Sequence, residues 1–143
     1  MLISIVLELR ALHQAQLRGH MGRANYAIVL AMLDRLDAAL AARAHEGNGP
    51  RSLTVSGLRG GHGNGDKVVL RKDDICTVRV TGLTGEVSKG LEKVLLSPGR
   101  PLWEIEGCAF EIVRSTCDAA ENGWAGKTSY EELAAAVIQA KRR

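Results

Sequence analysis

The hydrophobic pattern at the start of the chain has two successive periods. Over residues 3–10, apolar residues at the odd positions alternate with mostly polar ones at the even positions, which predicts a strand with one buried face. From residue 24 the apolar positions recur every three or four residues, at Tyr26, Val29, Leu33, Leu36 and Leu40. This spacing predicts one helix over residues 24–44 with a single apolar stripe. His45 falls at its end, and the glycines that follow stop it.

Shorter patterns of the same kinds fill the rest of the chain. A second helix is predicted over 86–96, and Ser129 and Glu132 match a capping box that starts a terminal helix reaching residue 139. The predicted strands are 52–58, 75–83, 103–105 and 109–113, with 59–66 as a flexible loop and 67–70 as a returning hairpin strand. The order predicts an α+β fold, a ferredoxin-like (RRM-like) βαββαβ domain over residues 1–120. A linker and an extra C-terminal helix follow over 121–143.

Composition narrows the function only a little. The 143 residues are 45% hydrophobic and fit one domain with a core, and the net charge of +3 permits a polyanionic partner without requiring one. Aromatic residues make up 3% of the chain, which is few for a sheet that stacks bases, so we expect phosphate and shape contacts to dominate any RNA binding.

Cysteine and histidine spacing predicts no cofactor. Cys76, Cys108 and Cys117 have no paired spacing, so neither a disulfide framework nor a zinc site is expected. The four histidines lack a metal-ligand pattern. The apolar start of the chain, residues 1–9, is too short and interrupted for a membrane span or signal peptide, so a cytoplasmic protein is expected.

The strongest candidate for chemistry is His45, with Arg51 six residues later across a glycine-rich turn. Histidine can exchange a proton near neutral pH, and a fixed arginine charge suits the negative charge that builds up on phosphate. A histidine at this position can equally just stabilise the helix end. His20 lies in a basic loop between Arg18 and Arg23, where the start of a helix favours anions.

Two glycine-containing segments were candidates for nucleotide binding. Residues 57–65 are glycine-rich but lack the dinucleotide-binding pattern, so we interpret them as a hairpin loop that contacts RNA through Arg59 and His62. Gly126-Lys127-Thr128 would need a glycine at position 121 to form a phosphate-binding loop, and Glu121 stands there. Tyr26 lies on the apolar stripe, where core packing is the simpler interpretation.

Three segments together carry a family resemblance. They are the loop and helix from His20 to Leu36, the block from His45 to Ser56, and residues 123–133, with the strand Thr77–Thr81 between them. The sequence resembles the N-terminal half of the CRISPR-associated endoribonucleases that process repeat RNA, in the RAMP superfamily. Such proteins usually carry a second RAMP domain, which we do not expect within these residues.

The resemblance implies a catalytic mechanism and a set of partners. It implies metal-independent cleavage of CRISPR repeat RNA, in which a 2′-hydroxyl attacks the adjacent phosphate and leaves a 2′,3′-cyclic phosphate. His45 matches the proton-transfer histidine, Arg51 stands where several members have a lysine, and His20 or Arg23 could replace the family's helix tyrosine, which spacing places near Leu30. The alternative is a non-catalytic RNA-binding or structural subunit of a CRISPR ribonucleoprotein. Either interpretation predicts crRNA as a partner, together with a second copy or a CRISPR-associated protein that supplies the second domain.

Overall fold

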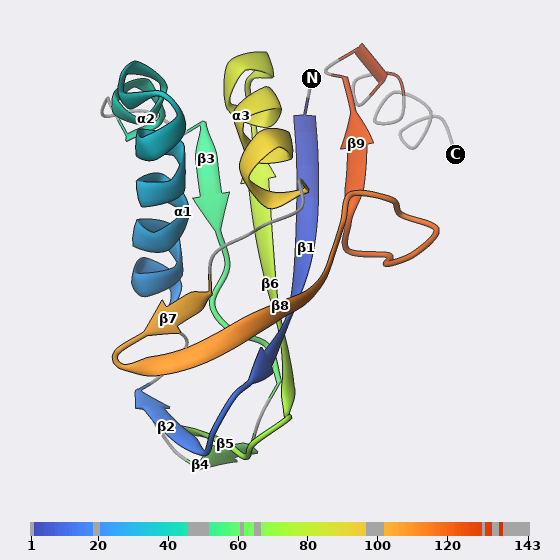
Figure 1. Ribbon diagram of the computed structural model, residues 1–143. Coiled ribbons are helices and arrows are strands. Elements are labelled where there is room, and N and C mark those ends of the chain that lie inside the picture. The colour runs from blue at the N-terminus through green and yellow to red at the C-terminus, as the bar shows by residue number, and fades with distance from the viewer. Residues whose placement is uncertain are drawn as a thin grey trace.

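A ten-residue strand, β1 (Leu2–Ala11), forms the centre of the fold in the computed structural model (Figure 1). The structure describes residues 2–18, 21–45, 52–60, 62–64, 67–96, 102–129, 131–132 and 135. One edge of β1 pairs antiparallel with β6 (Ile75–Gly82). The other edge pairs with β8 (Cys108–Thr116) and, nearer its start, with β9 (Gly126–Thr128).

Two short strands complete this six-stranded sheet, whose order is β3-β6-β1-β8-β7 with β9 beside β1. The edge strand β3 (Leu53–Val55) pairs with β6, and β7 (Trp103–Ile105) pairs with β8. The β7–β8 hairpin turns at Glu106 and Gly107, which both have positive φ angles of 47° and 79°. Two consecutive residues of this kind form the tight turn whose twist matches that of an antiparallel pair.

Helices cover one face of the sheet. Both α1 (Gly22–Leu36) and α3 (Gly85–Leu95) contribute apolar side chains to the core that contains Ile3, Ile5 and Val80. On the strands these side chains alternate with Ser4, Val6, Arg79 and Thr81, as the period-two pattern predicts. We call the first side of the sheet the covered face and the second the open face.

A small second sheet lies at one end of the large one (Figure 1). It consists of β2 (Ala15–Arg18), β5 (Lys67–Leu70) and β4 (His62–Asn64), in the order β2-β5-β4. The strand β2 is not predicted by the sequence pattern, and β4 lies within residues 59–66, for which the pattern predicts a loop. The hairpin prediction was right for 67–70 but wrong about its partner, because β5 pairs with β2 and β4, whereas residues 53–55 pair with β6.

The predicted long helix is two helices. The first, α1, ends at Leu36, Asp37 is extended with φ −160° and ψ 103°, and α2 (Ala38–His45) begins directly after it. The side chain of Asp37 explains the break, since Oδ1 accepts hydrogen bonds from the backbone amides of Ala39 (3.0 Å) and Leu40 (3.2 Å). An aspartate in this role caps a new helix rather than continuing the old one.

The α+β class is thus confirmed. The structure has more strands than a simple βαββαβ domain, because β2, β4, β5, β7 and β9 are present as well. At the far end, Ser129 Oγ accepts from the amide of Glu132 at 3.0 Å, as a capping box requires. The carboxylate of Glu132 accepts from the Thr128 hydroxyl. Most of the predicted terminal helix lies outside the described residues.

Candidate functional site

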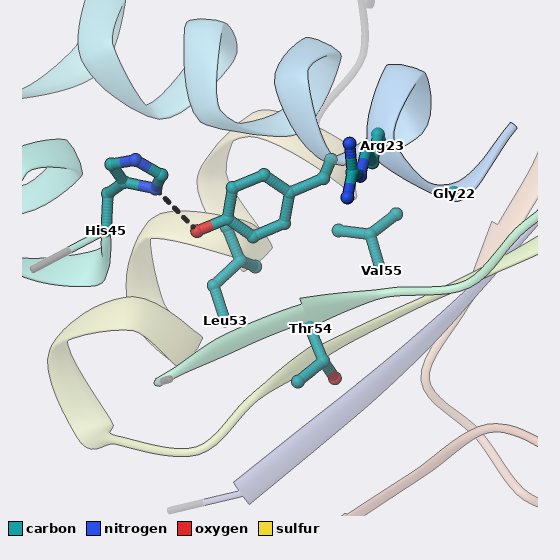
Figure 2. A pocket seen from close by; sticks show the side chains of 7 residues that line it. Gly22, Arg23, His45, Leu53, Thr54 and Val55 are labelled. Atoms are coloured by element: carbon teal, nitrogen blue, oxygen red, sulfur yellow. Dashed lines mark hydrogen bonds between the residues drawn. The ribbon is translucent and has the colours of Figure 1, made fainter. Parts of the chain in front are cut away.

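A pocket of about 800 Å³ lies where α1 and the end of α2 meet the edge strand β3 (Figure 2). Leu53 and Val55 point from β3 toward the pocket, whereas Thr54 points away, as successive strand residues must. Gly22, Arg23, Tyr26 and His45 complete the lining. The walls are mostly apolar, and the polar groups are a cation, a phenol and an imidazole.

Tyr26 and His45 are the pair that defines the pocket's chemistry. The Tyr26 hydroxyl is hydrogen bonded to His45 Nδ1 at 3.2 Å, and the ring centroids lie 5.8 Å apart (Figure 2). In one straight helix these residues, 19 positions apart, would lie about 28 Å from each other. The break at Asp37 therefore creates the pair, because it turns α2 back along α1.

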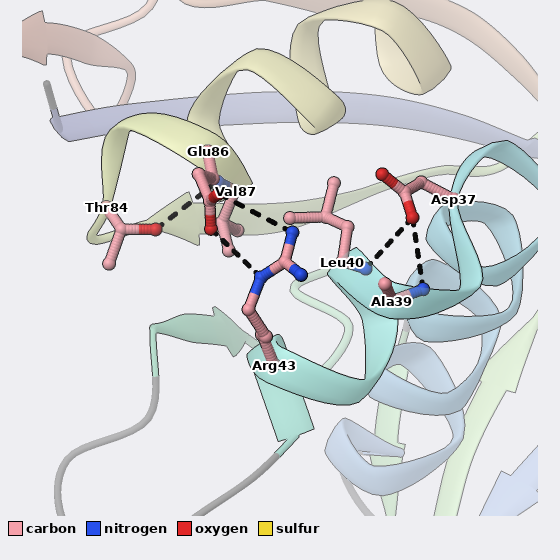
Figure 3. Close-up of polar contacts among 7 residues, drawn as sticks. All are labelled: Asp37, Ala39, Leu40, Arg43, Thr84, Glu86 and Val87. Carbon is pink, nitrogen blue, oxygen red and sulfur yellow. Dashed lines mark hydrogen bonds and ion pairs between the residues drawn. The ribbon is translucent and has the colours of Figure 1, made fainter.

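Two sets of polar contacts hold α2 in that position (Figure 3). The first is the Asp37 cap at its start. The second is an ion pair with α3, in which Arg43 Nε and Nη2 lie 3.1 and 3.5 Å from the two carboxylate oxygens of Glu86. A guanidinium that meets both oxygens of one carboxylate fixes direction as well as distance. Both side chains are about half exposed, so this pair contributes orientation more than stability.

The other wall of the pocket is the first turn of α1. This turn begins after Met21, which has φ 57° and makes no side-chain cap hydrogen bond. Arg23 is exposed on the turn. Amides at the start of a helix together with an arginine favour an anion at this end of the pocket.

A buried amide side chain fixes the start of α1 against the sheet. Asn25, which is fully buried, accepts a hydrogen bond from Trp103 Nε1 at 3.0 Å and donates one to the Ser56 carbonyl at 3.0 Å. It thereby ties α1 to β7 and to the segment that follows β3. Arg23 lies two residues before Asn25 and Tyr26 lies one residue after it, so the turn that lines the pocket is held in position by a contact within the core.

The predicted site residues are distributed over several places. His45 and Arg23 line the pocket, and Arg18 is exposed at the end of β2. Arg59 lies away from the loop to which the sequence analysis assigned it, because it pairs with Thr77 of β6 through backbone hydrogen bonds of 2.9 and 2.8 Å. His20, Arg51 and the side chain of His62 lie outside the described residues.

Tyr26 is the site residue that sequence reasoning undervalued. Its place on the apolar stripe suggested core packing, and it is indeed half-buried against the core. Its hydroxyl nevertheless reaches His45. The signal was Asp37, a helix-capping residue inside an otherwise continuous helical pattern.

Among the described residues, no group of three or more histidine, cysteine, aspartate or glutamate side chains is placed to hold a metal ion. Within the same residues, none of the helices has the length and apolar character needed to cross a membrane. The three cysteines form no disulfide.

The fold defined by this sheet and its helices is shared with RAMP proteins, as the sequence resemblance predicted. The chain matches a structure of Cas6 in a product complex with a TM-score of 0.63 and 21% identity, over 93% of this chain and 47% of that one. A RAMP protein described as binding different RNA substrates matches with a TM-score of 0.61 and 16% identity, over 80% of this chain and 47% of that one.

A Thermus thermophilus Cas6 structure matches with a TM-score of 0.52 and 22% identity, over 93% of this chain and 43% of that one. The chain therefore spans about half the length of the solved proteins that it resembles. No family model matches the sequence. No curated protein matches it either.

Proposed function

We propose that this chain is the N-terminal domain of a CRISPR repeat-RNA endoribonuclease and that His45 transfers a proton during cleavage. The observation that carries the proposal is the hydrogen bond between Tyr26 and His45 in a pocket that also holds Arg23 and the start of α1. The Cas6 and RAMP neighbours, one of them described as binding RNA, support RNA as the ligand class. The strand and helix order β1, α1, β3, β6, α3, β8 supports a ferredoxin-like core.

The proposed reaction needs no metal. The 2′-oxygen of one nucleotide attacks the next phosphorus, the bond from phosphorus to the 5′-oxygen breaks, and a 2′,3′-cyclic phosphate and a 5′-hydroxyl remain. One proton must leave the 2′-hydroxyl and one must reach the departing 5′-oxygen. Arg23 and the α1 amides stabilise the charged phosphate, and Arg51 keeps its proposed role as a second positive charge.

Tyr26 sets which nitrogen of His45 exchanges a proton. When Nδ1 donates to the phenol oxygen, Nε2 is a general base in the neutral imidazole and, once protonated, a general acid in the imidazolium. A phenol that donates to Nδ1 would leave Nε2 with the proton of a neutral imidazole, which is too weak an acid for this step. The proposal therefore requires Nδ1 as the donor, and Nε2, the nitrogen that does not contact Tyr26, exchanges the proton with RNA. Tyr26 is therefore proposed as a positioning residue.

The test is cleavage of 5′-labelled repeat RNA in EDTA by the chain and by its His45→Ala and Tyr26→Phe variants. We expect His45→Ala to lose about 10²–10⁴-fold in rate with RNA binding unchanged. Tyr26→Phe should lose about tenfold and shift the pH profile of the rate, since the tautomer is no longer held. Arg35→Ala, which removes an exposed charge far along α1, serves as the control.

Undiminished cleavage by His45→Ala would refute the assignment. Binding without cleavage by the unaltered chain would favour the alternative, a non-catalytic RNA-binding subunit of a CRISPR complex. The proposed oligomer, or a partner protein that supplies a second domain, is tested separately by light scattering of the purified chain with and without RNA.

A further inference from the structure

The open face of the sheet carries an aromatic and cationic cluster separate from the His45 pocket. Trp124, in the turn before β9, lies close to two arginines. The Cζ atom of Arg59 is 4.4 Å from the centroid of the indole ring, and that of Arg79 is 5.5 Å from it. These distances are within the range in which a cation is attracted to an indole. We call these three residues the Trp124 cluster.

The side chain of Arg79 and the backbone of Arg59 are held in place before any ligand binds. Arg79 lies on β6, and its Nε and Nη2 donate to Ser4 Oγ of β1 at 3.3 and 3.0 Å. Arg59 is fixed through its backbone to Thr77, two residues from Arg79 on the same strand. Less conformational entropy is therefore lost when such side chains bind a ligand.

Carboxylates of the described residues do not neutralise the charge of the cluster. Other basic side chains on this side of the sheet have acidic partners: Arg10 pairs with Glu111 and Asp73, and Arg114 pairs with Glu121. Within the described part of the chain, neither Arg59 nor Arg79 forms an ion pair with a carboxylate. Two uncompensated guanidinium groups on one ring attract a polyanion.

A hollow of about 350 Å³ adjoins the cluster. Besides Trp124 and Arg79, its lining includes Ser4, Lys127 and Thr128. Hydroxyl groups and cations beside an aromatic ring are the groups that bind the sugar, the phosphate and the base of a nucleotide.

We infer that the Trp124 cluster is a second RNA site, which binds an unpaired nucleotide by stacking and by contacts to its phosphate. Single-stranded RNA is favoured over duplex because only an unpaired base can leave its stack and lie on the indole or on the flat guanidinium of Arg59. Arg79 and the hydroxyl of Thr128 then lie beside the backbone. The inference rests on the proposed function only in taking RNA as the polymer, since it involves neither His45 nor cleavage.

A Trp124 site differs from what composition led us to expect. The few aromatic residues argued against base stacking, because stacking sheets usually carry their rings on strands. Here one ring is supplied by a turn and placed over the strands by two arginines.

The chain provides its own reporter for a test. Of its two tryptophans, Trp103 is fully buried, whereas Trp124 is half-buried on the open face. We would titrate the chain in EDTA with an unlabelled twelve-nucleotide oligouridine and follow tryptophan emission. A base stacked on Trp124 should quench a saturable part of that emission, while heparin, a polyanion without bases, should not.

Three variants and one control variant sharpen the test. Trp124→Phe should abolish the quench and keep most of the affinity measured by anisotropy, since a ring remains. Trp124→Leu should weaken binding about tenfold, the size expected for one lost stacking contact. Arg79→Ala should weaken binding and reduce its salt dependence, whereas Arg35→Ala should leave both unchanged. The emission of Trp103 reports that each variant is folded.

The outcomes separate this inference from the proposed function. A quench that heparin reproduces, or an unchanged affinity in Trp124→Leu, would overturn the Trp124 site even if the chain cleaves RNA. A base-dependent quench that is lost in Trp124→Phe supports it even if the chain cleaves nothing, and His45→Ala should keep that quench.

Discussion

The same strands present two different chemistries on their two faces. On the covered face, Ile3, Ile5 and Val80 are almost completely buried under the helices. On the open face, Ser4 and Arg79 alternate with them, and hydroxyl groups and charges replace the apolar side chains. The two sets of residues occupy alternate positions along β1 and β6. Neighbouring residues of one strand therefore point to opposite faces of the sheet.

The difference teaches where stability and recognition are located. The covered face buries apolar area and places α1 and α2, so changes there should lower the free energy of unfolding. The open face includes the partly exposed side chains of Arg79 and Thr81, and the loss of such groups costs a folded protein little. Three changes test this division, from the largest expected effect to the smallest.

The largest effect is expected from Asn25→Ala on the covered face. The substitution leaves the Trp103 Nε1–H and the Ser56 carbonyl without the partners that they have at 3.0 Å. Both the lost hydrogen bonds and the cavity are costly, and we expect about 3 kcal/mol less unfolding free energy in urea denaturation. Gln16→Ala, an exposed change on β2, should cost less than about 0.5 kcal/mol. Similar stability of the two variants would mean that the Asn25 bridge does not hold α1.

The second test uses alkaline pH, which acts on Cys76 of the covered face. Burial, and then the negative charge of Asp74, raise the pKa of the Cys76 thiol from 9.0 to about 11. Because the folded state holds this proton more tightly than the unfolded state, its contribution is complete below pH 9 and is lost as the pH rises through 11. Two pKa units correspond to about 2–3 kcal/mol.

The measurement is the unfolding free energy between pH 8.5 and 11.5. This interval extends about half a pH unit beyond the pKa of the thiol in the unfolded state and beyond its pKa in the folded state, so it covers the expected loss of stability. Cys76→Val removes the titrating thiol while keeping an apolar side chain, so its stability should fall less over this interval. Cys108→Ser, at a site that is only partly buried, should retain the full decline. Parallel curves for the native chain and Cys76→Val would show that the thiol is solvated.

Much of this fold is readable from the sequence because the covered face has a regular period. Residues 3–10 and 75–83 mostly alternate between apolar and polar, and the structure has β1 and β6 there. The strand β2 was missed because Ala15–Arg18 is only four residues long and its pattern is formed by Ala15 and Leu17 alone. The partner of β5 was misassigned because pairing between distant strands leaves no periodic signal.

The site was less predictable, for a physical reason. His45 could be identified by its position after a helical pattern, but its partner depended on a bend at Asp37 that apolar spacing does not reveal. Spacing along one continuous helix pointed to Leu30, while the folded chain brings Tyr26 to the imidazole. The Trp124 cluster joins residues from three separate segments, so only tertiary structure could show it.

The smallest expected effect on stability comes from substituting a matched pair of glycines, one on each face of the sheet. Gly82 on β6 lies beneath α3, where an added Cβ would come within 2.9 Å of Ser88 Oγ and 3.1 Å of the Ser88 Cα atom. Gly126 on β9 pairs with Ser4 of the open face and has nothing within 4 Å of the same position. Gly82→Ala must push α3 outward and should cost about 1–3 kcal/mol. Gly126→Ala should change stability by less than about 0.5 kcal/mol. Urea denaturation of both variants measures the contrast, and equal losses would mean that the open face is packed against a neighbour as closely as the covered one.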